Sequence, residues 1–84
     1  MIPIPEPIPD QLYCLEWKFK DEGEEEDLFK EGEVVGTFNI VRDDETDAII
    51  FIDFKVDGVL SVIRFKIEHV VSIREYNYEK QSKL

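Results

Sequence analysis

Residues 47–67, DAIIFIDFKVDGVLSVIRFKI, decide the fold that the sequence predicts. The Asp57-Gly58 pair at their centre is typical of a two-residue type I′ turn, because both turn positions need a positive φ, which glycine adopts freely and aspartate tolerates. Such a turn predicts a β-hairpin in which Val56 faces Val59. Side chains alternate between the two faces of a strand, so one face of this hairpin is almost wholly apolar and is expected to be core. That face carries Ala48, Ile50, Ile52, Phe54, Val56, Val59, Ser61, Ile63, Phe65 and Ile67.

The opposite face of the hairpin mixes apolar and charged residues. Its apolar members form a predicted apolar island of Ile49, Phe51, Leu60 and Val62. Either another segment of the chain covers this island, or the island is an interaction surface, since contiguous exposed apolar patches on small domains usually mark such sites. Arg64 is expected to lie over the Phe51 ring in a cation–π contact.

The chain length, the cysteine count and the net charge limit the classes of protein that the chain can belong to. Its 84 residues predict a single small domain. Cys14 is the only cysteine, which excludes an intramolecular disulfide framework and a multi-cysteine zinc site. The chain shows neither a signal-peptide pattern nor a long apolar run, so a cytoplasmic protein is expected. The net charge of −10 disfavours nucleic acid and anionic membranes as direct partners.

Five strands are predicted, at residues 11–20, 33–42, 47–56, 59–67 and 70–75. Proline at alternate positions from Pro3 to Pro9 predicts an extended, polyproline-II-like arm over residues 1–10, followed by a β domain over residues 11–76 and a flexible tail over residues 77–84. One face of the first predicted strand is expected to be core and carries Tyr13, Leu15, Trp17 and Phe19, of which Trp17 is expected to be the largest contributor. Gly36, in the middle of the second strand, predicts a bend or bulge.

Two acidic segments interrupt the strands. Residues 21–33 hold eight carboxylates and one lysine, and they predict a long loop with Leu28 and Phe29 tucked onto the domain. Residues 43–47, DDETD, predict a tight turn. The candidate partner-binding carboxylates are Asp21, Glu22, Glu24, Glu25, Glu26, Asp27, Asp43, Asp44, Glu45 and Asp47.

The order of loop lengths, with a long loop after the first strand and a short interruption before the last, resembles an SH3-like or Sm-like small barrel. The predicted fold is therefore mainly all-β: a five-stranded antiparallel barrel or strongly bent sheet. An OB-like barrel and a meander crossed by a helix are the alternatives. The chain has neither the Ala-Leu-Tyr-Asp-Tyr run and paired tryptophans of peptide-binding SH3 domains nor the glycine-rich RNA-binding signature of Sm proteins. No function is therefore carried over.

Nothing in the sequence predicts an enzyme. Nucleophilic catalysis needs a nucleophile, a base and an orienting group. The chain has one cysteine, Cys14, in the first predicted strand, and one histidine, His69, at the break between the last two. No phosphate-binding glycine loop is present. The acidic runs do not match the ligand spacing of an EF-hand. We expect neither a cofactor nor a metal.

Three functional hypotheses follow. The favoured one is a protein-binding module whose acidic segments engage a basic, nucleic-acid-binding surface of a partner, as an inhibitor would. The alternative is a structural protein that forms homo- or hetero-oligomers through the apolar island. The third, which the net charge disfavours, is a nucleic-acid-binding barrel with Phe51 as a stacking platform among Lys18, Lys20, Lys55, Arg64 and Lys66.

Overall fold

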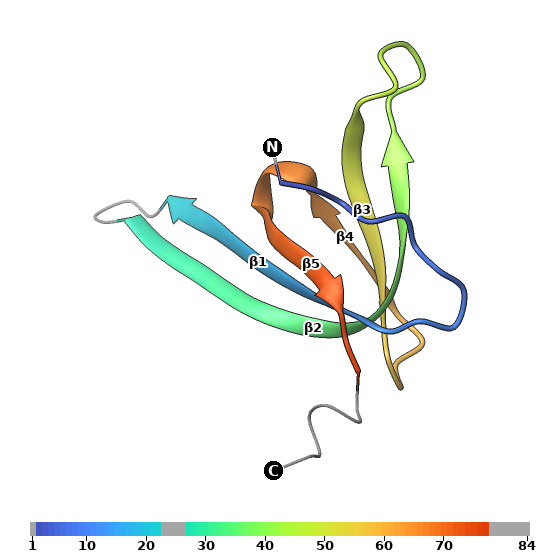
Figure 1. The fold of residues 1–84 in the computed structure, drawn as a ribbon. Helices are drawn as coiled ribbons and strands as arrows, with labels where there is room; N and C mark the ends of the chain where they lie inside the picture. Colours follow the sequence, from blue (N-terminus) through green and yellow to red (C-terminus); the bar gives the residue numbers. More distant parts are fainter. Residues whose placement is uncertain (1, 23–26, 78–84) are drawn as a thin grey trace.

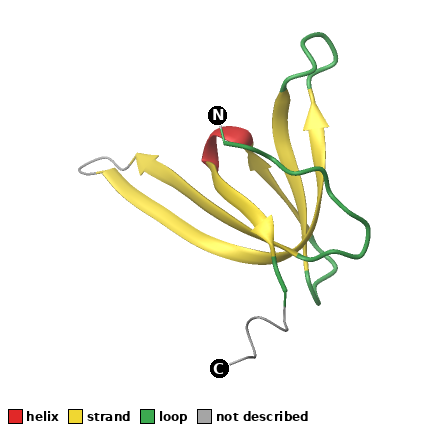
Figure 2. Ribbon diagram, viewed as in Figure 1, coloured by secondary structure: helices red, strands yellow, loops and turns green. Residues whose placement is uncertain are grey.

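One long strand, β2 (Asp27–Arg42), pairs along its two halves with two different neighbours. The computed structural model describes the backbone of residues 2–22 and 27–77. The other elements are β1 (Tyr13–Glu22), β3 (Ile49–Val56), β4 (Val62–Lys66), the 3₁₀ helix η1 (Ile67–His69) and β5 (Val70–Glu75). Together the strands form one antiparallel sheet in the order β4-β3-β2-β1-β5, with β4 and β5 at its edges (Figure 1). The predicted mostly-β architecture is confirmed, and the sheet is open rather than closed into a barrel (Figure 2).

Gly36 is the point at which β2 changes partner. Residues 27–36 of β2 pair with β1, and residues 36–42 pair with β3, so Gly36 faces both Tyr13 and Val56. A Cβ atom at Gly36 would overlap the carbonyl oxygen of Lys55 and lie 2.9 Å from the amide nitrogen of Asp57. Glycine therefore allows β3 to approach β2 here. β2 is strongly curved (Figure 1), and it is the strand in which the sequence predicts a bend.

The core lies on one face of this curved sheet, which we call the core face. It is formed by Tyr13, Leu15, Phe38, Ile52, Phe54, Val70 and Ile73, which are all at least 93% buried. The Tyr13 and Phe38 rings meet edge to face, with 4.9 Å between their centroids. Trp17, expected to lead the core, is only half-buried and packs at its margin.

The N-terminal segment lies across the sheet without regular secondary structure over residues 2–8 (Figure 1). Ile2 and Ile4 pack against the core cluster, whereas Ile8 is 54% exposed. The Tyr13 hydroxyl accepts a hydrogen bond from the Ile8 amide at 3.0 Å and donates one to the Glu6 carbonyl at 3.4 Å. A buried tyrosine thus holds this proline-rich segment in place through its polar end.

The predicted register of the β3–β4 hairpin is wrong by two residues. Phe54 faces Ile63 and Ile52 faces Phe65, and five residues, 57–61, connect the strands. The reason lies in the turn: Gly58 has φ 80°, but Asp57 does not have a positive φ, so the turn is not type I′. A shift of two residues preserves the alternation, so Ile52, Phe54, Ile63 and Phe65 still share the predicted face.

The predicted long loop over residues 21–33 is also wrong. β1 continues to Glu22 and β2 begins at Asp27, so most of this segment is a two-stranded hairpin. Phe29 is 63% exposed rather than tucked onto the domain, and the Lys18 ammonium lies 5.0 Å from its ring centroid. Lysines of one strand face Phe29 and Glu31 of the other, and these cross-strand pairs favour a hairpin despite the acidic composition.

The last strand is found where the sequence predicts it, at Val70–Glu75. It lies beside β1, and the Tyr76 amide donates to the Leu12 carbonyl at 2.9 Å just past the paired residues. Residues 78–84 of the predicted tail lie outside the described part of the chain. Among the residues that are described, no helix has the length and apolar character needed to cross a membrane.

Candidate functional site

The two acidic segments lie at opposite ends of β2. Asp21 and Glu22 end β1 and Asp27 begins β2, whereas residues 43–47 follow Arg42 at the far end of the same strand. Glu24, Glu25 and Glu26 fall outside the described residues. Figure 1 shows the end of β1 and the start of β2 at one corner of the molecule and the β2–β3 turn at another. The acidic residues that the structure describes are therefore not brought together into one site.

The acidic turn at residues 43–47 is held by its own hydrogen bonds. The Asp43 carboxylate accepts from the Glu45 amide at 2.8 Å and from the Thr46 amide at 3.3 Å, and the Asp43 carbonyl accepts from the Asp47 amide at 2.9 Å. Asp47 adopts a left-handed conformation with φ 60°. Asp44 and Glu45 are left exposed, and neither carboxylate has an ion-pair partner among the described residues.

The predicted apolar island is divided in the folded chain. Ile49 packs against the core cluster, and Leu60 lies in the β3–β4 loop, where it is 95% exposed. Phe51 and Val62 are separated by the Asp53–Arg64 pair that lies between them in the register. The island residues therefore do not form the single patch that their alternation predicted.

Arg64 makes the contacts that divide the island. Its guanidinium donates two hydrogen bonds to the Asp53 carboxylate, at 2.7 and 3.0 Å. The same group lies 4.8 Å from the Phe51 ring centroid, which confirms the predicted cation–π contact. Hydrogen bonding to Arg64 holds the pKa of Asp53 below its ordinary value. Because Arg64 occupies one side of the Phe51 ring, that side is not available as a stacking platform for a base.

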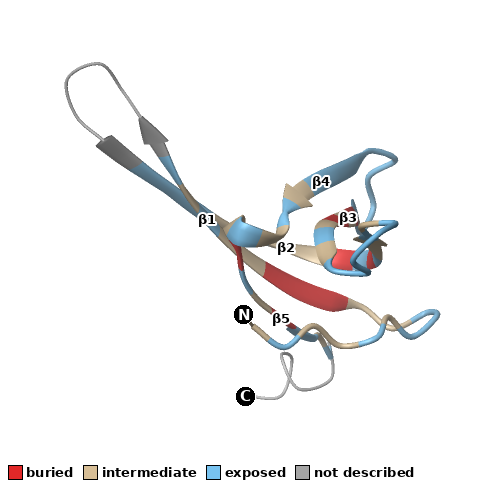
Figure 3. Cartoon of the chain, turned by 90° about the horizontal axis from the view of Figure 1, so that it is seen from above, coloured by how far each residue is buried: buried red, intermediate tan, exposed pale blue. Residues whose placement is uncertain are grey.

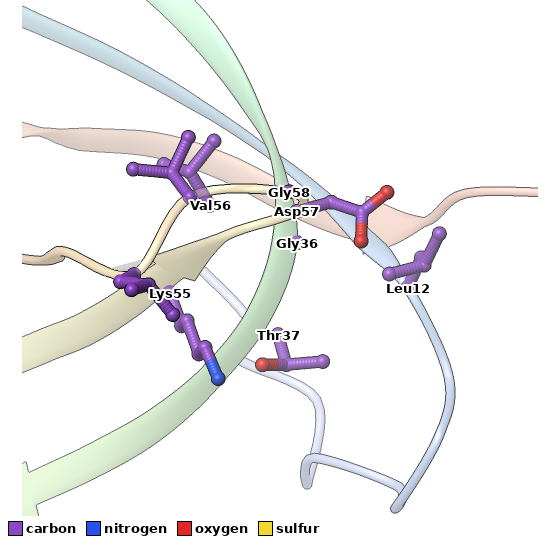
Figure 4. Close-up of a pocket in the computed structure, with 9 residues that line it drawn as sticks. Leu12, Gly36, Thr37, Lys55, Val56, Asp57 and Gly58 are labelled. Carbon is purple, nitrogen blue, oxygen red and sulfur yellow. The ribbon is translucent and has the colours of Figure 1, made fainter.

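A different apolar surface is present in the β3–β4 loop and β4. Val59, Leu60, Val62 and Ile63 are exposed by 47%, 95%, 59% and 40%. Leu60 and Val59 also line a shallow cleft. Figure 4 shows Gly36 and Asp57, which line the same cleft. Four large apolar side chains within five consecutive residues form an exposed apolar segment at the edge of the sheet, since β4 pairs with β3 alone.

The sequence did not single out an aromatic cleft that forms between β1, β4 and η1. It is lined by Trp17, Phe19, Ile63, Arg64, Phe65, Lys66 and His69, and its volume is about 350 Å³. The Trp17 ring stacks on Phe19 with 5.7 Å between centroids and on Phe65 with 6.2 Å, and Phe19 lies 5.4 Å from His69. The rings therefore form a continuous, largely apolar surface.

The cleft arises because β5 is shorter than β1. β5 pairs with β1 only as far as Trp17, so residues 18–22 of β1 have β2 as their sole partner in the described sheet. Phe19, two residues past that point, faces the cleft instead of the core. Sequence reasoning placed Phe19 in the core because it shares a face with Tyr13 and Leu15. The predicted last strand has six residues and the predicted first strand has ten. This difference in length indicated that the end of the first strand, where Phe19 lies, would extend past its neighbour.

The side chains with catalytic potential lie apart. Cys14 is buried on the face of the sheet opposite the core face, which we call the outer face. Its thiol lies 3.8 Å from a Glu33 carboxylate oxygen. Burial raises the pKa of the Cys14 thiol and Glu33 adds to this effect, while Arg74 opposes it. His69 contacts Phe19 beside the cleft. Across the described residues, no group of three or more histidine, cysteine, aspartate or glutamate side chains is arranged to hold a metal ion.

Comparisons of the chain with protein-family models, with curated proteins and with solved structures gave no significant match.

Proposed function

We propose that the protein is a non-enzymatic binding module whose acidic segments engage a basic surface of a partner protein. The observation that carries this proposal is the placement of the charge. Asp44 and Glu45 project from a hydrogen-bonded turn without ion-pair partners among the described residues, so their field is uncompensated and fixed in position. Such fixed charge steers a basic partner and holds it in register.

The separation of the two acidic segments limits the shape of that partner. They lie at opposite ends of a sixteen-residue strand, in a molecule whose longest dimension is 44 Å. A narrow pocket is too small to contact both segments at once, whereas an elongated basic track is able to do so. Nucleic-acid-binding surfaces have this shape and charge, so the proposal includes inhibition of such a surface by mimicry.

The test is affinity purification of partners from cells in which the protein is native, with and without nuclease, followed by elution in a salt gradient. Two variants remove charge: Asp44→Asn with Glu45→Gln, and Glu24→Gln with Glu25→Gln and Glu26→Gln. The matched control, Glu68→Gln with Glu75→Gln, removes two charges at exposed positions elsewhere. The proposal predicts a nucleic-acid-binding protein that elutes at lower salt from both charge variants than from the control. Elution of all three at the same salt would contradict it.

The proposal that the protein is not an enzyme is supported by the separation of Cys14 and His69. Cys14 contacts Glu33 on the outer face, and His69 contacts Phe19 beside the aromatic cleft. A raised thiol pKa also disfavours the thiolate that a nucleophilic cysteine requires. Cys14 is a free thiol, which supports a reducing compartment such as the cytoplasm as the proposed location.

A specific observation favours a second candidate function, assembly through the edge of the sheet. The exposed apolar segment of Val59, Leu60, Val62 and Ile63 replaces the predicted island as the surface for this role. Sedimentation of the wild type and of a Leu60→Ser, Val62→Thr variant tests it. Oligomers of the wild type that dissociate in the variant would support assembly, and a wild-type monomer at high concentration would refute self-assembly.

We further propose that the open sheet is a variant of the SH3-like layout. Two features support this likeness: the last strand returns beside the first, and a single 3₁₀ turn connects the fourth strand to the fifth. On this proposal, the proline-rich segment over residues 1–10 is an extended arm that covers part of the open side.

A further inference from the structure

We propose that the N-terminal segment, residues 2–10, exchanges between two copies of the chain, so that the segment of each copy lies on the core face of the other. The partner that this surface fits is therefore a second copy of the chain. The inference goes beyond both proposed functions, since it uses neither the acidic segments nor the exposed apolar segment at the edge of the sheet. It rests on three observations: how the segment is held, which groups it meets, and the turn that joins it to β1.

The first observation is that side chains, rather than a ladder of backbone hydrogen bonds, hold the segment. Within the described chain, no backbone–backbone hydrogen bond joins residues 2–7 to a strand. Every second residue from Pro3 to Pro9 is a proline, which has no amide hydrogen to donate. Ile2 and Ile4 pack against the core cluster, and none of residues 2–10 is fully buried (Figure 3). The segment is therefore able to leave the sheet without breaking a strand pairing.

The second observation is that the groups which receive the segment are present once in every copy. The Tyr13 hydroxyl accepts from the Ile8 amide at 3.0 Å and donates to the Glu6 carbonyl at 3.4 Å. The Arg42 guanidinium lies 3.9 Å from the Glu6 carboxylate. The same segment from a second copy meets the same groups in the same order, so exchange keeps each of these contacts. This is why exchange of an identical element is a low-cost route to a dimer.

The third observation is strain in the turn that joins the segment to β1. Pro9 and Asp10 are the central residues of this turn, and the Gln11 amide donates to the Ile8 carbonyl at 3.1 Å. Asp10 has φ 68°, a left-handed conformation that glycine adopts freely and other residues adopt at a cost. Within the described chain, the Asp10 side chain makes no hydrogen bond or ion pair that would offset this cost.

An extended hinge at residues 9–11 removes this cost and carries the segment away from its own sheet. Short hinge loops under strain favour the exchange of elements between copies. In the closed form, the short connection keeps the segment at an effective concentration of about a millimolar near its own sheet, so monomers are expected in dilute solution. Relief of strain in both hinges lowers the concentration at which dimers form. We therefore expect a monomer–dimer equilibrium rather than a permanent dimer.

The experiment measures self-association of the full chain by sedimentation equilibrium, with two opposed substitutions at the hinge. Asp10→Gly relaxes the turn, because glycine adopts a positive φ without cost, whereas Asp10→Thr strains it further, because β-branched residues are rarely left-handed. Both variants lose the same charge, so charge does not distinguish them. Because strain is relieved twice in each dimer, we expect the dimer dissociation constant to rise about tenfold or more in Asp10→Gly and to fall by a similar factor in Asp10→Thr.

Asp47 provides the matched control. It is the other non-glycine residue with a positive φ in the described chain, at 60°, and it lies in the β2–β3 turn rather than at the hinge. Asp47→Gly therefore removes the same charge and relieves the same kind of strain at a place that exchange does not open. We expect this variant to dimerise with the dissociation constant of the wild type.

Isotope-filtered NMR of mixed labelled and unlabelled chains identifies the part of the chain that is exchanged. At concentrations where dimers form, we expect nuclear Overhauser effects between Ile2 or Ile4 of one copy and the core cluster of the other. Dimers that form through the edge of the sheet would show these effects within one copy alone. The Leu60→Ser, Val62→Thr variant would dissociate such edge dimers, whereas it is expected to leave exchanged dimers intact.

Each opposing outcome would overturn the inference. A wild type and an Asp10→Thr variant that both stay monomeric at high concentration would exclude exchange. Dimers without effects between copies from Ile2 or Ile4, or equal dissociation constants for Asp10→Gly and Asp47→Gly, would assign self-association to another surface. Displacement of the segment by a capped PPLPPLP peptide in a chain that stays monomeric would assign the core face to a foreign proline-rich partner. Salt-dependent binding of a basic partner is expected to be the same in Asp10→Gly and Asp10→Thr, so this inference and the acidic-segment proposal succeed or fail separately.

Discussion

Replacement of Gly36 by alanine is expected to be the most destabilising single-methyl addition to this sheet. The new Cβ atom would overlap the Lys55 carbonyl oxygen and lie 2.9 Å from the Asp57 amide nitrogen. Both are backbone atoms of β3 and its turn, so no side-chain rotation relieves the overlap. β3 must move away from β2 at the residue where β2 changes partner.

The magnitude follows from the contacts that this movement affects. Overpacking a tight site costs about 1–3 kcal/mol. The movement also strains the hydrogen bond that the Asp57 amide donates to the Val35 carbonyl at 2.8 Å, and its loss adds about 1 kcal/mol. A total of about 2–4 kcal/mol is a large part of the about 4–13 kcal/mol that a chain of this length has available. For a domain of this size it lowers the melting temperature by at least about 8 °C.

Thermal unfolding followed by far-ultraviolet circular dichroism measures this change. Gly58→Ala is the control, because Gly58 has φ 80° and an added Cβ would have no atom within 4 Å. It carries the cost of a left-handed alanine, about 1–2 kcal/mol, without any overlap. A Gly36→Ala melting temperature equal to or above that of Gly58→Ala would refute the argument that backbone overlap at Gly36 fixes the sheet.

Three further predictions concern single side chains. Asp53→Asn should make unfolding less sensitive to acid: the folded pKa of Asp53 is lowered, so its contribution is present above the unfolded value near 4 and is lost as the pH falls through the folded value. The effect is small because the pair with Arg64 is exposed, and melting curves between pH 2 and pH 6 measure it. Cys14 should react with iodoacetamide more slowly in the folded protein than in urea, because it is buried and its thiol pKa is raised; equal rates would show an accessible thiol. Tyr13→Phe should cost about 1 kcal/mol and speed hydrogen exchange at the Ile8 amide, because the acceptor of that amide is lost; unchanged exchange would mean that the tyrosine does not hold the segment.

The sequence predicted which residues share a face of a strand better than it predicted where the strands end and how they are connected. Alternation placed Ile52, Phe54, Ile63 and Phe65 on the core face. This prediction is correct despite the register error, because a shift of two residues leaves each side chain on the same face of its strand. The error came from the turn, where the Asp57 amide donates to the Val35 carbonyl of β2, a tertiary contact that the two turn residues do not reveal. The acidic hairpin was mistaken for a loop because composition describes single residues, whereas a hairpin is stabilised by pairs such as Lys20 with Phe29.

The candidate site was harder to predict than the fold. Asp44, Glu45 and Asp47 are exposed, but their distance from the acidic end of the β1–β2 hairpin depends on the continuity of β2 through Gly36. The aromatic cleft depends on where β5 stops along β1, and a pattern within one strand does not contain the length of its neighbour. Trp17 and Phe19 therefore read as core residues, although the sheet leaves them at its open side.

The pairing of β5 with β1 has a consequence for biosynthesis. Tyr13 faces Glu75, so the first strand waits for nearly the whole described chain before it meets its last neighbour. The two hairpins that share β2 are local and are able to form earlier, as the chain leaves the ribosome. Until β5 arrives, Leu15 has no neighbour on that side of β1, and a nascent chain paused at this stage exposes an edge that a chaperone or a second nascent chain would meet first.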